Sequence, residues 1–245
     1  MRRFIAIVFV ALAGFGAALA QAQQRFAVIS LIGDRMELAY AKGVDGQPVD
    51  RIERRYIPLD DSRIDRYTLL AANDVLKKLA PGPDPVLLQA FDRSYFDVSS
   101  GTGVIIDWMR QLVKDAKPKV THALLITKIQ YEGVPALQKP FVGGGTLEGV
   151  GFFVGREAPL KGMDPNSGGP GFLSPFAYFQ VTLIDLASGK VVREEKGTAS
   201  NLLSATGTDS GNPWDTLSAE RKLQAIVDLV KRELEIVLPK VLKPA

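Results

Sequence analysis

Few side chains in this sequence are suited to catalysis. Its 245 residues include no cysteine and only one histidine, His122. The lack of cysteine excludes thiolate nucleophiles, thiolate zinc sites and disulfides, and a single histidine excludes histidine-clustered metal centres. No Gly-x-Ser-x-Gly elbow, Ser-x-x-Lys pair or His-Glu-x-x-His helix identifies a nucleophile or a metal site. We therefore expect His122 to be a structural residue near the end of a strand, and no cofactor or metal to be bound.

Carboxylate chemistry is the enzymatic alternative. Asp and Glu side chains alone can perform acid–base catalysis when two of them converge on one pocket. The candidates are Asp60, Asp61, Asp92 and Asp97. Adjacent acids before a helix usually cap it and interact with its dipole, so a structural role is open as well. The corresponding function is a carboxylate-dependent hydrolase that acts on an envelope polymer.

Two glycine-rich segments have part of the pattern of an anion-binding loop. Residues 143–149 begin with three glycines but lack the Gly-Lys-Ser/Thr ending of a phosphate loop, and no helix is expected after them. Residues 99–103 do precede an expected helix, where they either expose free amides to a small anion or simply cap the helix. We expect the first segment to be a flexible loop.

Glycine and proline are concentrated at about residues 143–175, which are expected to form a long loop excursion around a short strand at 149–154. Loops of this length in compact domains tend to be functional or disordered. Apolar side chains accompany the excursion, and exposed ones could dock a partner protein. The candidate partner-binding residues are Phe152, Phe153, Phe172 and Leu173. A mobile loop without a binding role is the alternative.

The N-terminus has the pattern of a secretory signal peptide. Arg2 and Arg3 precede an apolar run over residues 4–20, and Ala-x-Ala sequences follow it at once. The run is shorter than an ordinary membrane span, and the Ala-x-Ala pattern is typical of a cleavage site. We expect residues 1–22 to be removed, which leaves a periplasmic or secreted bacterial protein without a membrane span.

The charge of the chain gives no indication of a nucleic-acid partner. The 30 basic and 27 acidic residues give a net charge of +3, and two of the basic residues belong to the leader. A protein that follows phosphates needs a stripe of positive charge. Here Glu53 interrupts the densest basic group, which contains Arg51, Arg54 and Arg55. We expect no nucleic acid to bind.

Strands and helices alternate along the part of the chain that must position these residues. The apolar periodicity predicts an N-terminal β-meander, two amphipathic helices separated by a strand, a buried central strand, a hairpin and a long final helix. Strands are expected at 25–32, 36–41, 51–57, 86–91, 120–129, 176–186 and 190–196, and helices at 62–79, 103–116 and 217–238. We expect Thr216 or Ser218 to cap the last helix and Pro239 to end it. The sequence predicts one α/β domain over residues 24–245, a sandwich of a mixed β-sheet with amphipathic helices packed on it.

The hairpin at residues 181–192 carries a local motif. Its Asp185, Ser188 and Gly189 follow the pattern [IV]-D-x-x-[ST]-G-x-[IV]-[IV]. The motif is similar to a hairpin in the periplasmic α/β domains of the curli-secretion CsgG family, of the lipoprotein activators of penicillin-binding proteins, and of the amino-terminal domain of the Tol-system propeller protein. The order of elements is similar too, with a helix before a strand such as residues 121–126 and a long amphipathic helix at the end.

This resemblance implies a role without catalysis, because these families bind envelope partners or assemble pores. The activators and the curli channel are lipoproteins, whereas this chain lacks the cysteine that carries the lipid. An outer-membrane anchor is therefore not implied. The expected function is that of a non-enzymatic periplasmic accessory or adaptor protein that binds a cell-envelope protein partner.

Overall fold

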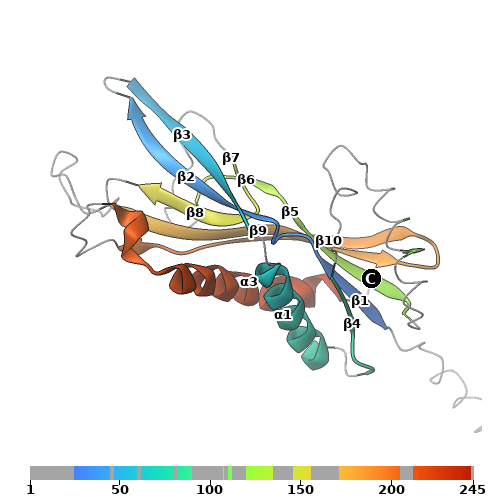
Figure 1. Ribbon diagram of the computed structural model, residues 1–245. Coiled ribbons are helices and arrows are strands. Elements are labelled where there is room, and N and C mark those ends of the chain that lie inside the picture. Colours follow the sequence, from blue (N-terminus) through green and yellow to red (C-terminus); the bar gives the residue numbers. More distant parts are fainter. Residues whose placement is uncertain are drawn as a thin grey trace, which may run out of the picture.

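The computed structural model describes residues 25–44, 47–59, 62–79, 82–89, 107, 110–111, 120–134, 146–155, 171–204 and 212–243; for residues 41–44 and 47–51 it describes the backbone only. The expected signal peptide lies outside these ranges, as does all but a few residues of the helix expected at 103–116. The described residues form one mixed β-sheet, a two-stranded sheet beside it, and helices packed on one face (Figure 1). The α/β fold class that the sequence predicts is confirmed.

The elements follow in chain order. The strands are β1 (Phe26–Ser30), β2 (Arg35–Val44), β3 (Gln47–Pro58), β4 (Val86–Gln89), β5 (His122–Lys128), β6 (Gln130–Glu132), β7 (Thr146–Glu148), β8 (Val150–Gly155), β9 (Phe172–Asp185), β10 (Lys190–Ser200) and β11 (Leu203–Ser204). The helices are α1 (Arg63–Leu79), the short 3₁₀-helix η3 (Pro213–Thr216) and α3 (Ala219–Val241).

Strand β9 is the central strand of the main sheet. Along one edge it pairs antiparallel with β10 and, at its start, with β11. Its other edge carries two strands end to end, with β8 paired to residues 172–177 and β5 paired to residues 179–185. The sheet therefore divides into a hairpin wing (β8, β2 and β3) and a parallel wing (β5, β1 and β4), which lie at opposite ends of β9 (Figure 1).

The two wings separate at Tyr178. Its N–H donates to the carbonyl oxygen of Gly149 at 2.7 Å, and its carbonyl oxygen accepts from the N–H of Ile129 at 3.3 Å. Gly149 has a φ of 66°, in the left-handed region that glycine adopts without steric cost. Between Ile129 and Gly149 the chain leaves the main sheet and forms the antiparallel pair of β6 and β7. The Tyr178 hydroxyl donates to the Gly133 carbonyl oxygen at 3.0 Å, which fixes this excursion to the sheet.

The expected N-terminal meander is wrong. Strand β1 pairs in parallel with β4 and β5, whereas β2 and β3 form an antiparallel hairpin that pairs with β8 in the other wing. All five residues of β1 are buried, which is typical of a parallel strand covered on both faces. At residues 52–58, where its side chains are described, β3 is mostly exposed.

Other expectations from the sequence are confirmed. Strand β5 is central, and its residues 123–126 are buried. The 181–192 motif forms the hairpin of β9 and β10, in which Asp185 Oδ1 accepts from the N–H and the hydroxyl of Ser188 at 2.7 and 2.9 Å. Gly189 follows with a φ of 69°. Both strands are longer than expected, because β9 already begins at Phe172 and β10 continues to Ser200.

Helices α1 and α3 pack beside each other on the same face of the sheet (Figure 1). Ser218 caps α3, as expected, and its hydroxyl accepts from the N–H of Arg221 at 3.3 Å. Leu229 belongs to the buried face of α3, whereas Leu223 and Val227 are only half-buried. The expected end at Pro239 is wrong. The helix continues to Val241, and the N–H of Leu242 still donates to the Leu238 carbonyl oxygen at 3.0 Å.

A buried aspartate joins α1 to the chain between β1 and β2. Asp65, in the first turn of α1, is 1% exposed. Its Oδ1 accepts from the Ser30 hydroxyl at 2.7 Å and from the N–H groups of Ile32 and Gly33 at 3.0 Å each. Since buried polar groups are costly without partners, these contacts fix where β2 begins relative to α1.

The docking of α3 is tested by placing a charge on each side of the helix. Leu234 is fully buried, whereas Ile236 on the same helix is 46% exposed. Because a buried unpaired carboxylate is expensive, Leu234→Asp is expected to lower the free energy of unfolding by about 3 kcal/mol or more. The matched control Ile236→Asp is expected to change it by less than about 1 kcal/mol. Chemical denaturation measures both, and equal losses would contradict the packing.

The role of Asp65 is tested in the same way. Asp65→Ala leaves two buried N–H groups without an acceptor, so it is expected to cost about 3 kcal/mol. Ser30→Ala removes a single hydrogen bond and is expected to cost about 1 kcal/mol. Thermal and urea unfolding of both variants measure the difference, and an Asp65→Ala protein as stable as Ser30→Ala would show that these contacts are not what fixes the connection.

Candidate ligand-binding site

The structure does not support the expected exposure of the four candidate partner-binding residues. Phe152 and Phe153 lie in β8, and Phe172 and Leu173 lie in β9; all four are buried, with at most 6% of their surface exposed. The alternating side chains of β8 are covered on both faces, by the core that includes Trp214 on one and by the cluster that includes Val134 and Leu147 on the other. The expected loop thus forms strands in its described part. Its remaining residues, 143–145 and 156–170, lie outside the described residues.

Phe152 and Phe153 illustrate the two faces. On the helix side, the Phe152 ring meets the Trp214 ring edge-on, with ring centres 5.5 Å apart. On the opposite side, Phe153 lies 5.9 Å from Phe172 in a cluster that also includes Tyr178. These aromatic rings therefore stabilise the core, and a partner could not reach them without opening it.

Of the residues singled out for catalysis, the structure describes only His122. His122 begins β5, as expected; its Nδ1 lies 2.9 Å from Thr121 Oγ1 and its Nε2 lies 4.0 Å from Asp185 Oδ2. Hydrogen bonds from Ser188 hold the pKa of Asp185 below its ordinary value. Asp60, Asp61, Asp92 and Asp97 lie outside the described residues, as do residues 99–103. Within the described part of the chain, no group of three or more His, Asp or Glu side chains could hold a metal ion.

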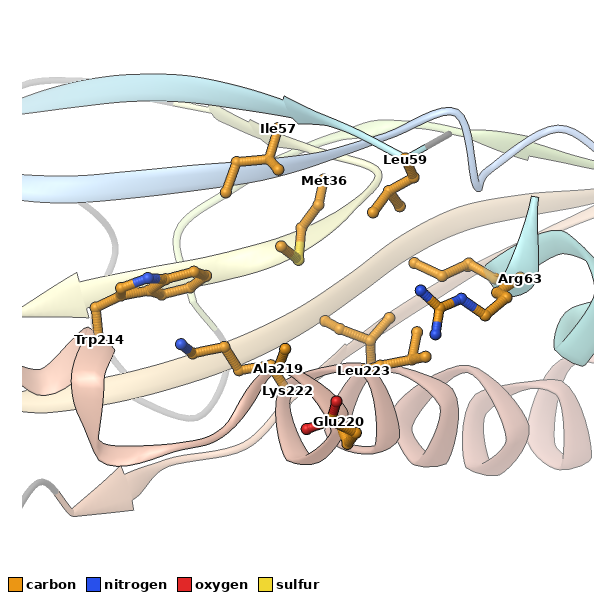
Figure 2. A pocket seen from close by; sticks show the side chains of 11 residues that line it. Met36, Ile57, Leu59, Arg63, Trp214, Ala219, Glu220, Lys222 and Leu223 are labelled. Carbon is orange, nitrogen blue, oxygen red and sulfur yellow. The ribbon is translucent and has the colours of Figure 1, made fainter. Parts of the chain in front are cut away.

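A pocket of about 400 Å³ opens between the hairpin wing and the first turns of α1 and α3 (Figure 2). This volume lies in the lower part of the roughly 300–1,000 Å³ range of small-molecule sites. Strands β2 and β3 supply one wall, α3 the facing wall, and η3 and α1 the two ends. The lining residues are Met36, Ile57, Leu59, Arg63, Ile64, Trp214, Ala219, Glu220, Lys222, Leu223 and Ile226.

Most of these side chains are apolar. Met36 and Ile57 face the pocket from paired positions on β2 and β3, and Leu223 faces them from α3. Met36, Ile57 and Leu223 are only partly buried although they pack against the core. A concave apolar surface with a few polar groups at its rim is the usual form of a ligand site.

Trp214 closes one end of the pocket. Asn212 caps the short helix η3, because its Oδ1 accepts from the Trp214 N–H at 3.1 Å. The indole ring packs against the Phe152 ring. It also makes a cation–π contact with the ammonium of Lys222, whose Nζ lies 3.8 Å from the ring centre. Both contacts restrain the indole, so this end of the pocket is preformed.

Three charged residues, Arg63, Glu220 and Lys222, line the pocket. The pKa of Lys222 is lowered, chiefly because burial disfavours the ammonium, while the charge of Asp215 acts in the opposite direction. Glu220 has a lowered pKa because its own N–H and the Ser218 hydroxyl donate to it, with a smaller contribution from Arg63. Among the described residues, no carboxylate forms an ion pair with Lys222.

A charged cluster lies on the opposite face of the same hairpin. Glu37 is 1% exposed; its Oε2 accepts from the Glu148 N–H at 2.6 Å and its Oε1 lies 3.1 Å from Arg54 Nε. Arg54 also donates to the Thr146 carbonyl oxygen at 2.7 Å, and Arg35 lies 3.4 Å from Glu148. Each charge in this cluster meets an opposite one, and the contacts bind β7 to the hairpin wing. We interpret the cluster as structural support for the pocket wall.

The buried carboxyl of Glu37 gives a test by pH. Burial raises its pKa above the ordinary 4.5, so the folded protein holds this proton more tightly than the unfolded chain. Stability contributed by Glu37 therefore falls as the pH rises from 4.5 through the raised pKa. We expect Glu37→Gln to gain stability relative to the parent protein over this interval, as measured by urea unfolding at a series of pH values.

The control for this test is Glu53→Gln. Glu53 is on the same hairpin, its side chain is 46% exposed, and it pairs with Arg55. This variant is expected to follow the parent protein in parallel across the pH series, because surface ion pairs contribute little. A constant difference between Glu37→Gln and the parent protein would contradict the proposed burial of the charge.

Sequence reasoning missed the pocket. An Asn-Pro-Trp sequence just before the capped final helix is a local signal for η3, but it does not show what Trp214 faces. The pocket walls come from residues as far apart as Met36 and Ile226, which only the tertiary fold brings together.

Comparisons with known proteins leave the family open. No family model and no curated protein matches this sequence. Among solved structures, the chain is similar to a dodecameric PelC variant from Paraburkholderia phytofirmans, with 11% identity, 89% of each chain covered and a TM-score of 0.33. It is also similar to a putative neuraminyllactose-binding hemagglutinin homologue from Helicobacter pylori, with 12% identity, 90% of this chain and 89% of that chain covered, and a TM-score of 0.38. A hypothetical protein from Chlamydia trachomatis matches with 10% identity over 86% of this chain and 98% of that one, at a TM-score of 0.27.

Similarity at this level identifies neither a family nor a ligand for this chain. The described helices are also too short or too polar to cross a membrane.

Proposed function

We propose that this protein is a non-enzymatic periplasmic accessory protein that binds a component of the cell envelope by enclosing an apolar group in the pocket between hairpin β2–β3 and α3. The observation that carries the proposal is the pocket itself, an apolar concavity of about 400 Å³ with a preformed aromatic end. Burial of an apolar group there would be driven by the hydrophobic effect.

The architecture around the pocket supports a binding role. The wall formed by β2 and β3 is held from behind by the contacts of Glu37, and the beginning of β2 is fixed to α1 by Asp65. The facing wall is the first part of α3, which Ser218 caps. A pocket held by rigid elements loses little conformational freedom when a ligand enters, so more of the contact energy contributes to affinity.

Two features of the sequence support the location and the absence of catalysis. The N-terminal residues have the pattern of a signal peptide, which directs a protein to the periplasm or out of the cell. The 181–192 hairpin resembles that of periplasmic domains that bind envelope partners. On the basis of this resemblance, the proposal includes an adaptor role toward an envelope protein.

The test is binding of a neutral apolar dye, N-phenyl-1-naphthylamine, to the purified protein, followed by the dye's own fluorescence. We expect saturable binding that Leu223→Trp weakens at least about tenfold, because the larger ring occupies the space between the walls. Leu70→Trp is the matched control, since Leu70 is 45% exposed on α1 and does not line the pocket. This control is expected to bind the dye as the parent protein does.

Ile57→Trp, on the facing wall, provides an independent variant in case Leu223→Trp unfolds the protein. Thermal unfolding of each variant shows whether it is folded. Absence of saturable dye binding, or dye binding that neither pocket variant weakens while both remain folded, would overturn the proposal.

A further inference from the structure

The arrangement of charge in the pocket points to the chemistry of its ligand. Figure 2 shows Trp214 and Lys222 at one end of the pocket and Arg63 at the other, with the apolar side chains between them. A ligand that fills the pocket would thus lie along an apolar path and meet a cation at its end.

The two basic residues differ in their surroundings. The charge of Arg63 acts on Glu220, so an acidic group already lies near this cation. Lys222 forms no ion pair with a carboxylate of the described residues, and its Nζ lies against the Trp214 ring at 3.8 Å. An indole ring stabilises a cation but leaves the other donors of the ammonium available. An anionic group would therefore gain the most binding energy at the Lys222 end of the pocket.

The partial burial of the Lys222 ammonium also favours an anion at this end of the pocket. It lowers the pKa of Lys222, because the ammonium is partly shielded from water. Asp215 reduces this effect through its charge without contacting the ammonium closely enough to form an ion pair. A ligand carboxylate beside Lys222 would give the ammonium an ion-pair partner through a charge-assisted hydrogen bond.

The size of the pocket limits the apolar part of the ligand. A volume of about 400 Å³ suits one narrow group and is small for two acyl chains side by side. The lining side chains Met36, Leu59 and Leu223 are unbranched or γ-branched aliphatic groups, which suit a flexible chain.

We propose that the ligand is a free fatty acid, with its carboxylate beside Lys222 and its single alkyl chain along the wall formed by Met36, Ile57 and Leu223. This inference rests on the proposed function, since it names the ligand of the same pocket. An apolar side chain of a partner protein would fill the pocket without using Lys222, and a two-chain phospholipid would exceed its volume.

The test is a competition in which amphiphiles displace the neutral dye N-phenyl-1-naphthylamine below their micellar concentrations. Dodecanoate, dodecanol and dodecyltrimethylammonium share one alkyl chain and differ in the charge of the head. We expect dodecanoate to displace the dye at a concentration about tenfold lower than the cationic amphiphile. Shortening the fatty acid is expected to weaken displacement by about three- to fourfold for each methylene removed.

The variants assign the preference to one side chain. Lys222→Gln is expected to abolish the preference for the anionic amphiphile, and Lys222→Glu is expected to reverse it. Because Lys222 lines the pocket, the dye affinity of each variant is measured first and the amphiphiles are compared within that variant. Lys231→Gln is the matched control, because Lys231 is exposed on the same helix and does not line the pocket. It is expected to keep the preference of the parent protein.

The outcomes separate this inference from the proposed function. Dye binding with equal displacement by anionic and cationic amphiphiles would overturn the fatty-acid ligand and leave the pocket as a binding site for an uncharged apolar group. A preference for dodecanoate that survives in Lys222→Gln would overturn the role of Lys222. Absence of dye binding together with absence of dodecanoate binding would overturn both proposals. Binding to phosphatidylglycerol vesicles that excess dodecanoate does not reduce would identify a membrane surface instead.

Discussion

The structure depends on one constraint in its sheet, the pairing of two strands end to end along a single edge of β9. Where β8 ends and β5 begins along this edge, the Tyr178 N–H donates to the Gly149 carbonyl oxygen and the Tyr178 carbonyl oxygen accepts from the Ile129 N–H. Strands β6 and β7 leave the sheet between Ile129 and Gly149. The two wings can then take different directions from the shared strand. Helix α3 packs on β9 and β10, so it is fixed by the central strands rather than by either wing.

The pocket follows from this division. The hairpin wing lies beyond the part of the sheet that α1 covers (Figure 1). The side chains of β2 and β3 therefore face the first turns of α3 across the pocket (Figure 2). Trp214 closes one end of the pocket, and no other described aromatic residue lines the pocket. The contacts of Asp65 and Glu37 hold the start of β2 and the back of the hairpin wing, and so fix the pocket wall that β2 and β3 form. The site is thus a consequence of how the elements are joined.

Local patterns in the sequence predicted what local interactions determine. The 181–192 hairpin was predictable because Asp185, Ser188 and Gly189 form its turn by themselves, and the start of α3 was predictable from the Ser218 cap. Strand pairing was not, because β1 and β2 are adjacent in sequence but belong to different wings. The exposure of Phe172 and of one of Phe152 and Phe153 was mispredicted, because the sequence does not show that side chains from other elements cover both faces of β8 and of the start of β9. The pocket could not be predicted, since its walls combine residues from distant elements with no periodic pattern of their own.

The central claim is that this pocket, and no other surface, encloses the apolar group. The most direct measurement is a titration of isotopically labelled protein with N-phenyl-1-naphthylamine, followed by backbone and indole N–H resonances in NMR spectra. The account predicts that the largest shifts fall on β2, β3, η3 and the first turns of α1 and α3, with the Trp214 indole N–H among the most affected. Shifts that leave these residues unchanged while saturable binding is observed would place the site elsewhere and contradict the account.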